Sequence, residues 1–253
     1  MLNIIIPTGN STALVISTKN IKNKKEINDF ILNKCSDIEQ VGFINKNKPE
    51  LVMAGGEFCV NATRSAINYY LNNNYGKIKI KIPNLNSIVE GGIDNNGETW
   101  MLLDTFKSYK EVFSKIVNNI ITIIEFKGIV HAIVKDDIIK NKNEKEIKNI
   151  AFSILEELKL TRYKAAGVIF KNYKNRITRI TPVVYVKDIK TLFIETACGS
   201  GSAAIAMYNY FKFNVSNCKI IQPSQMCLNT KVYSDDKKIQ KIRISGIVYE
   251  LKK

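Results

Sequence analysis

Hydrophobic and polar residues alternate along much of the chain in short runs, which is the pattern of half-buried β-strands. The alternation is clearest in "TALVIS", "KIKIKI" and "ITRITPVVYV", and further predicted strands are "LNIII", "QVGFI", "ELVMA", "TWMLLD", "TIIEF", "VHAIVK", "AAGVIF" and "KIRISGIVYEL". Apolar residues at helical spacing predict helices at 25–33, 61–71, 144–158 and 200–210. Many strands with few crossover helices favour an α+β fold over a doubly wound sheet.

Two of the predicted helices begin alike. The segments "GGEFCVNATRSAINYYL" and "IETACGSGSAAIAMYNYF" each run from an acidic residue through a cysteine and a small or polar turn into a helix. This likeness indicates an internal duplication with one cysteine helix in each half. We therefore expect two domains, 1–115 carrying Cys59 and 116–253 carrying Cys198, with a boundary near Phe106 to Asn119. The last predicted strand, in "IRISGIVYEL", is a candidate to return to the first domain.

Composition fits a globular protein with a sizeable core. The chain has 253 residues, of which 45% are hydrophobic, and no run approaches the roughly 20 apolar residues of a membrane span. Five cysteines are a sparse and odd set, which argues against a disulfide framework and for a reducing cytoplasm without an export signal. Cys35, Cys218 and Cys227 lack a chemical context and are expected to be core or surface thiols.

The net charge of +15 raises the alternative of a basic nucleic-acid-binding protein, because clustered lysines and arginines neutralise phosphates. Here the lysines are scattered through "IKNKKE", "NKNEKEIKN" and "DDKKIQKIR" among Asn, Ile and acidic residues. They are not interleaved with aromatic residues on a nucleic-acid-binding motif. A solvated basic surface is the simpler interpretation.

Candidate chemistry centres on the two cysteine helices. Because His131 is the only histidine, the chain has no HExxH motif or Cys/His zinc cluster, and it also lacks a Walker loop and a strand-linked GxGxxG. No metal or nucleotide cofactor is expected. At a helix N-terminus, free N–H groups and the helix dipole favour negative charge, so they can lower a thiol pKa toward neutrality and can hold a carboxylate. A Cys/His hydrolase that pairs His131 with either cysteine is an alternative.

The segments "EFCVNATRS" and "ETACGSGSAA" resemble the two active-site segments of the diaminopimelate epimerase superfamily. "PTGNSTALV", "IEQVGFI" and "GIVHAIVKDD" resemble further segments of that family in the same order. The resemblance implies two similar α+β domains, each a curved sheet or barrel around a central helix, with the active site in the cleft between them. It also implies an isomerase that inverts an amino-acid α-carbon without pyridoxal phosphate.

Inversion needs a base on one face of the α-carbon and an acid on the other, and a thiolate and a thiol can exchange these roles. By resemblance Cys59 and Cys198 form this pair. The resemblance further implies that the substrate carboxylate is held by the backbone N–H groups of Val60, Asn61, Gly199 and Ser200. The side chains of Asn10 and Gln40 would position the substrate. His131 and Glu195 would orient the thiols or the α-ammonium group. Arg64 is expected to be structural.

Departures from the diaminopimelate epimerases concern the far end of the substrate. Ile129 stands where those enzymes carry an Asn before Pro-His, and "YVKDIKTLFIETAC" lacks their Arg. The sequence is more similar to the branch with cofactor-independent histidine racemases, some of which feed opine-type metallophore synthesis. Diaminopimelate epimerase and proline racemase-like activity remain alternatives. The expected partner is a small amino-acid substrate, without nucleic acid or membrane, and a homodimer is left open.

Overall fold

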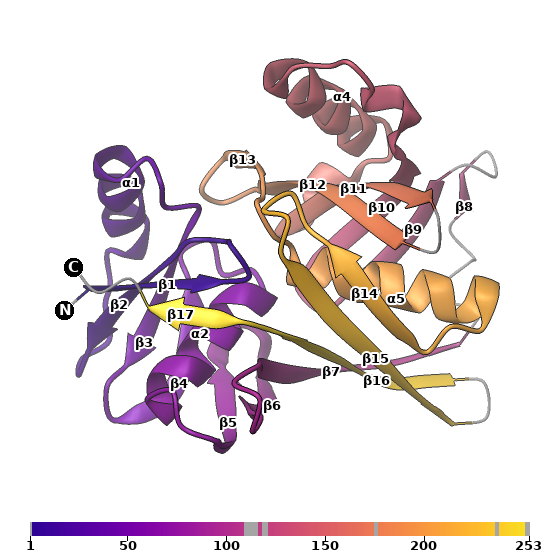
Figure 1. The fold of residues 1–253 in the computed structure, drawn as a ribbon. Helices are drawn as coiled ribbons and strands as arrows, with labels where there is room; N and C mark the ends of the chain where they lie inside the picture. The colour runs from indigo at the N-terminus through magenta and orange to yellow at the C-terminus, as the bar shows by residue number, and fades with distance from the viewer. Residues whose placement is uncertain (1, 109–115, 118–120, 175–176, 236–237, 251–253) are drawn as a thin grey trace.

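The structure is a computed structural model that describes residues 2–108, 116–117, 121–174, 177–235 and 238–250. It is a mixed α+β fold, as predicted, in which helices pack against a large and extensively paired sheet (Figure 1). The helices of the described part are α1 (Lys24–Lys34), α2 (Val60–Leu71), α4 (Glu144–Glu157) and α5 (Gly199–Phe213). Its strands are β1 (Leu2–Pro7), β2 (Thr12–Ser17), β3 (Gln40–Asn45), β4 (Lys48–Met53), β5 (Gly76–Ile82), β6 (Ser87–Ile93), β7 (Thr99–Ser108), β8 (Ile116–Val117), β9 (Ile121–Phe126), β10 (Ile129–Lys135), β11 (Ala165–Lys174), β12 (Ile177–Val186), β13 (Thr191–Ile194), β14 (Asn217–Ile221), β15 (Cys227–Asp235), β16 (Lys238–Gly246) and β17 (Val248–Glu250).

All of the predicted helices are present, with ends shifted by a few residues, because local signals define them. At the start of α4, the Asn143 side chain accepts from the Glu146 backbone N–H while the Glu146 carboxylate accepts from the Asn143 N–H, which is a capping box. Helices α2 and α5 both end at an asparagine in the left-handed conformation, Asn72 and Asn214. The two cysteine helices are therefore alike at both ends.

Strand pairing joins the described strands into one network that brings the end of the chain back to its beginning. β17 pairs antiparallel with β1, with Tyr249 opposite Ile6. β16 runs antiparallel to β7, which belongs to the first half of the chain, and to β15, which belongs to the second. The last described strand thus lies beside the first strand of the chain.

The predicted strands are all found, but the list was incomplete and one strand is divided. The run at 241–251 breaks at Ile247, whose carbonyl accepts a hydrogen bond from the Thr8 N–H at 2.8 Å, next to the paired residues Pro7 and Val248. Strands β6, β8, β13, β14 and β15 were not predicted, because β8, β13 and β14 are short, β6 is interrupted by the run Glu90 to Gly92, and β15 contains asparagine and lysine among few apolar residues. Of the predicted boundary at Phe106 to Asn119, residues 109–115 and 118–119 lie outside the described residues.

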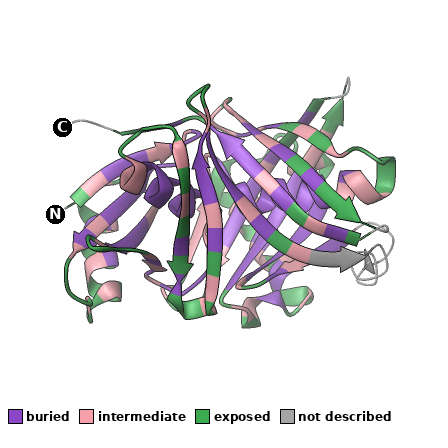
Figure 2. Ribbon diagram, turned by 90° about the horizontal axis from the view of Figure 1, so that it is seen from below, coloured by how far each residue is buried: buried purple, intermediate pink, exposed green. Residues whose placement is uncertain are grey.

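The core is built around the two cysteine helices. α2 packs against β1 to β7 and β17, whereas α5 packs against β10 and β14 to β16. One cluster of buried apolar side chains contains residues of both helices, while α1 and α4 cover separate clusters over β3 and over β11 to β13. Figure 2 shows buried residues where helices and sheet meet and exposed residues toward the outer edges. None of the described helices is long and apolar enough to span a membrane.

Candidate active site

Each of the two candidate cysteines is the N-cap residue of a buried helix. Cys59 precedes α2 and its Sγ accepts from the Ala62 N–H at 3.4 Å, while Cys198 precedes α5 and its Sγ accepts from the Gly201 N–H at 3.3 Å. Both cysteines have extended backbone angles, as an N-cap requires. A thiol that takes the place of the usual Ser or Asp cap is held at the positive end of a helix dipole.

The N-termini of α2 and α5 meet. The Asn61 Nδ2 donates to the carbonyl of Ala197 at 2.7 Å and so ties the first turn of α2 to the residue before Cys198. Gly199 is needed at the contact, because a Cβ there would lie 2.3 Å from Cγ1 of Val60. This close approach aims two sets of backbone N–H groups at one region.

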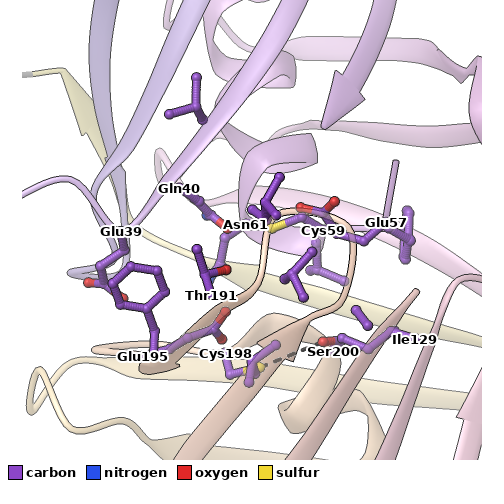
Figure 3. A pocket seen from close by; sticks show the side chains of 18 of the residues that line it. Glu39, Gln40, Glu57, Cys59, Asn61, Ile129, Thr191, Glu195, Cys198 and Ser200 are labelled. Atoms are coloured by element: carbon purple, nitrogen blue, oxygen red, sulfur yellow. Dashed lines mark hydrogen bonds between the residues drawn. The ribbon is translucent and has the colours of Figure 1, made fainter. Parts of the chain in front are cut away.

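One pocket is lined by Cys59 and Cys198 together with residues from both halves of the chain (Figure 3). Of the residues predicted from the sequence, the pocket lining includes Gln40, Cys59, Val60, Asn61, Glu195, Cys198, Gly199 and Ser200. Apolar side chains complete it, among them Phe58, Ile129, Val184, Val186 and Phe193. The pocket therefore combines two thiols, two helix N-termini and an apolar wall.

Asn10 and Gln40 form a hydrogen-bonded chain that ends on the first thiol. The Cys59 thiol donates to Gln40 Oε1 at 2.9 Å, and the Gln40 amide in turn donates to Asn10 Oδ1 and to Thr12 Oγ1. Asn10 is fully buried and does not line the pocket. In this structure its contact with the site passes through Gln40 and through Glu39 Oε2, to which the Asn10 Nδ2 donates at 2.8 Å.

His131 lies behind the Cys198 thiol. Its Nε2 lies 2.9 Å from Ser200 Oγ, and Ser200 Oγ lies 3.6 Å from the Cys198 Sγ. The imidazole is fully buried and does not line the pocket, and burial lowers its pKa from 6.5 to about 3. A neutral ring that contacts Ser200 instead of a sulfur is not the Cys/His pair of a hydrolase.

Burial changes the expectation for the thiols. It raises the pKa of both Cys59 and Cys198 above the ordinary value, and the neighbouring Glu195 carboxyl raises each further. Hydrogen bonds from the helix N–H groups oppose this rise but are the smaller effect. Although a helix N-terminus can lower a thiol pKa, the loss of hydration outweighs that effect in this pocket.

Three carboxyl groups surround the thiols. Burial raises the pKa of Glu57 to about 7 and that of Glu195 to about 8, and it also raises the pKa of Glu39. Glu195 shares a hydrogen bond with Cys198. Glu39 and Glu57 are not among the residues predicted from the sequence. A signal for Glu57 was present, since an acidic residue precedes the cysteine in both helix motifs.

Two further predictions concern residues outside the pocket. Arg64 is fully buried, and its guanidinium donates to Thr8 Oγ1 and to the carbonyls of Thr99 and Gly246. It fixes α2 against β7 and β16, which confirms a structural role. The side chains of Cys35, Cys218 and Cys227 are partly buried, and none of the three lines the pocket.

Comparison with known proteins decides the family. A family model described as the N-terminal domain of the histidine racemase CntK matches residues 4–250. The chain belongs to this histidine racemase family. A histidine racemase from Fusobacterium nucleatum subsp. nucleatum (strain ATCC 25586) is 29% identical over 232 residues, which cover 87% of this chain and 84% of that protein. A histidine racemase from Staphylococcus aureus (strain Mu50) is 25% identical over 221 residues, 82% of this chain and 79% of that protein.

Solved structures place this histidine racemase family member in a wider fold group. A hydroxyproline epimerase from Agrobacterium vitis superposes with a TM-score of 0.66 and covers 99% of this chain and 90% of its own, at 9% identity. At that identity the likeness concerns the fold alone. The expected resemblance to two-cysteine racemases, and to the histidine racemase branch among them, is confirmed.

Proposed function

We propose that this chain racemises histidine by a two-base mechanism in which Cys59 and Cys198 act on opposite faces of the α-carbon. The observation that carries the proposal is that the two cysteines cap two facing helices and line one pocket. Family membership and the curated relatives named histidine racemase support the substrate.

The helix N-termini supply the electrostatic part of the reaction. Loss of the α-proton leaves negative charge that spreads onto the substrate carboxylate, and this charge must meet donors that are already oriented. The first N–H groups of a helix have no partner within the helix. Those of Val60 and Asn61 in α2 and of Gly199 and Ser200 in α5 are therefore suited to hold the carboxylate between the thiols.

The proton balance closes over one turnover. A thiolate on one face takes the α-proton, and the thiol on the opposite face gives its proton to the carbanion, so the product leaves inverted and the two sulfurs have exchanged protonation states. Because burial raises the pKa of both thiols, the pocket favours protonated sulfurs. The positive α-ammonium group of an entering substrate favours a thiolate, so we expect thiolate formation to be coupled to binding.

The side chains that line the pocket support a reaction without pyridoxal phosphate. Binding that cofactor covalently requires a lysine, and no lysine is found among the described residues that line the pocket. The two thiols and two helix N-termini instead provide the acid, the base and the charge stabilisation.

We extend the proposal to the organisation of the chain. Residues 1–115 and 116–253 would form two domains, each around one cysteine helix, with the pocket in the cleft between them. The separate surroundings of α2 and α5, and a pocket lined from both halves, support this division. A cytoplasmic location and a homodimer remain part of the proposal.

The test is hydrogen exchange at the α-carbon. The purified chain, without added cofactor, is incubated in D2O with L-histidine, and mass spectrometry follows the gain of one deuteron while chiral chromatography follows D-histidine. We expect both to increase together. L-Proline and LL-diaminopimelate are run in parallel, and exchange confined to either of them would replace histidine as the substrate.

A further inference from the structure

Glu57 is a lining residue to which the two-base mechanism assigns no function. Its side chain is 8% exposed, and its Oε2 atom has no hydrogen-bond partner. A buried carboxyl oxygen without a hydrogen-bond partner is costly, so Glu57 Oε2 is suited to accept a hydrogen bond from a substrate that enters the pocket. Backbone N–H groups of Gly55 and Glu57 itself hold the carboxyl group in place.

The other two carboxyl groups of the pocket are already engaged. Glu39 Oε2 accepts from Asn10 and from the Thr196 N–H at 3.0 Å, and its Oε1 accepts from the Thr196 hydroxyl. Glu195 shares its hydrogen bond with Cys198. Among the described residues that line the pocket, Glu57 is the carboxyl group with a fully buried oxygen that has no hydrogen-bond partner.

Glu57 stands beside the apolar wall. A Cβ at Gly55 would lie 2.8 Å from Glu57 Oε2 and 2.6 Å from Val186 Cγ1, so Glu57 and Val186 flank the same glycine. Figure 3 shows Glu57 on the side of the pocket that carries Ile129, away from Glu39 and Glu195. With the substrate carboxylate on the helix N-termini, this apolar wall is the surface left for the substrate side chain, and Glu57 is a polar group beside it.

We propose that Glu57 Oε2 accepts a hydrogen bond from the imidazole N–H of the substrate and selects for a ring that carries such a donor. The inference rests on the proposed racemisation of histidine. No lysine, arginine or histidine is among the described residues that line the pocket, and Lys164, a cation outside this lining, lowers the pKa of Glu57 by less than burial raises it. An imidazole, which always carries at least one N–H, meets this requirement, while a hydrocarbon or thiophene ring of similar size leaves the carboxylate unpaired.

The test compares two ligands in wild type, Glu57→Leu and Glu57→Gln. KM and kcat are measured for histidine by deuterium exchange, and β-(2-thienyl)-L-alanine, whose ring has no N–H, is measured as a competitive inhibitor. In Glu57→Leu we expect KM for histidine to rise at least about tenfold with a smaller change in kcat, while the inhibition constant of thienylalanine stays the same or falls. Glu57→Gln, which keeps an acceptor oxygen, should lie between. Glu156→Gln on the exposed face of α4 is the matched control and should leave all constants unchanged.

Three results would overturn the inference. A parallel rise in both constants would assign Glu57 to the α-ammonium group, and a fall in kcat at constant KM would assign it to the Cys59 thiol. An unchanged KM would show that it does not touch the substrate. Failure of the proposed function is distinguishable from all three, because wild type itself would then exchange no α-proton of histidine, and the inference would fall with it.

Discussion

Gly199, the first residue of α5, lies so close to Val60, the first residue of α2, that a Cβ at position 199 would come within 2.3 Å of Val60 Cγ1 and 2.7 Å of its Cβ. No rotamer of valine removes the second contact, because Cβ is fixed by the backbone. The distance between the two helix N-termini, and with it the spacing of the two thiols, therefore depends on the missing side chain at Gly199.

Gly199→Ala tests this dependence. The new methyl group must push the helix N-termini apart by a fraction of an ångström to about 1 Å, and a misplacement of that size can cost about 100-fold in activity. We expect kcat/KM for histidine to fall to that extent in steady-state exchange assays. Adding Val60→Ala removes the 2.3 Å contact but leaves the one at 2.7 Å, so it should restore only part of the activity. Near-wild-type activity of Gly199→Ala alone would contradict the close contact.

Cys59→Ser and Cys198→Ser should each abolish racemisation while the protein stays folded. Serine preserves the shape of the cap, but its hydroxyl is far too weak an acid to exchange roles with a thiol, and loss of a general acid or base costs about 10²- to 10⁴-fold. The measurement is α-deuterium exchange, with circular dichroism to verify the fold. Cys227→Ser, which changes a partly buried thiol outside this pocket, is the control and should keep full activity.

Stability should depend on pH through the buried carboxyl groups. Glu57 has a folded pKa of about 7 and Glu195 of about 8, against 4.5 in a freely hydrated side chain. The folded state therefore keeps protons that the unfolded state releases. The contribution of these two carboxyl groups to the free energy of unfolding is full below about pH 4.5 and is lost as the pH rises to about 7 for Glu57 and about 8 for Glu195. At about 1.4 kcal/mol per pH unit, Glu57 contributes about 3 kcal/mol at most.

Glu57→Gln should weaken this dependence of the free energy of unfolding on pH. Denaturant unfolding near pH 8 is expected to show the variant as more stable than wild type, with little difference near pH 5. The exposed Glu156→Gln should follow wild type at both values. A Glu57→Gln profile parallel to wild type would show that this carboxyl ionises freely in the folded protein.

The architecture could be predicted to a considerable extent because its signals are local. Alternating apolar residues located most strands, and the small-residue turns after Cys59 and Cys198 located both helix starts. Strand β15 was not predicted although its buried positions, Leu228, Thr230 and Val232, alternate with Asn229 and Lys231, because one of the three is a polar threonine and the alternation is therefore weak. Its pairing with β14 and β16 supplies the long-range part of the signal, which the local sequence does not carry.

The site was less predictable where it depends on burial. A helix N-terminus can lower a thiol pKa, but burial in the pocket, whose wall includes residues of β12 and β13, raises the pKa of both thiols, and burial cannot be read from the local sequence. Likewise His131 and Asn10 were matched to a family pattern, but only packing shows that each reaches the pocket through one intermediate residue, Ser200 or Gln40. The sequence indicates which residue types take part, and the fold decides how deeply each side chain is buried.

His131 should remain neutral in the folded protein well below its ordinary pKa. Burial lowers that pKa from 6.5 to about 3, and its Nδ1 has no partner. Because it is the only histidine, its ring protons give a single set of NMR signals. We expect no titration of these signals between about pH 8 and pH 5, and stability that is lost as the pH falls from 6.5 toward about 3. An inflection of the His131 ring signals near pH 6.5 in the folded protein would show that water reaches the ring.

The substrate preference tests the most specific part of the proposal. Diaminopimelate carries a second ammonium and a second carboxylate at its far end, and both must be paired when they lose water. Ile129, 4% exposed, lines the pocket where a polar anchor would be needed, and the described lining offers three carboxyl groups but no lysine or arginine. A second carboxylate would thus meet like charge without a counter-ion, whereas an imidazole brings one donor to Glu57 and an apolar ring to the wall. We expect deuterium incorporation into L-histidine and little into LL-diaminopimelate, with kcat/KM lower by at least about 100-fold for the latter. An equal or higher kcat/KM for diaminopimelate would mean that its distal charges are solvated outside the pocket, and the diaminopimelate epimerase assignment would then replace histidine racemase.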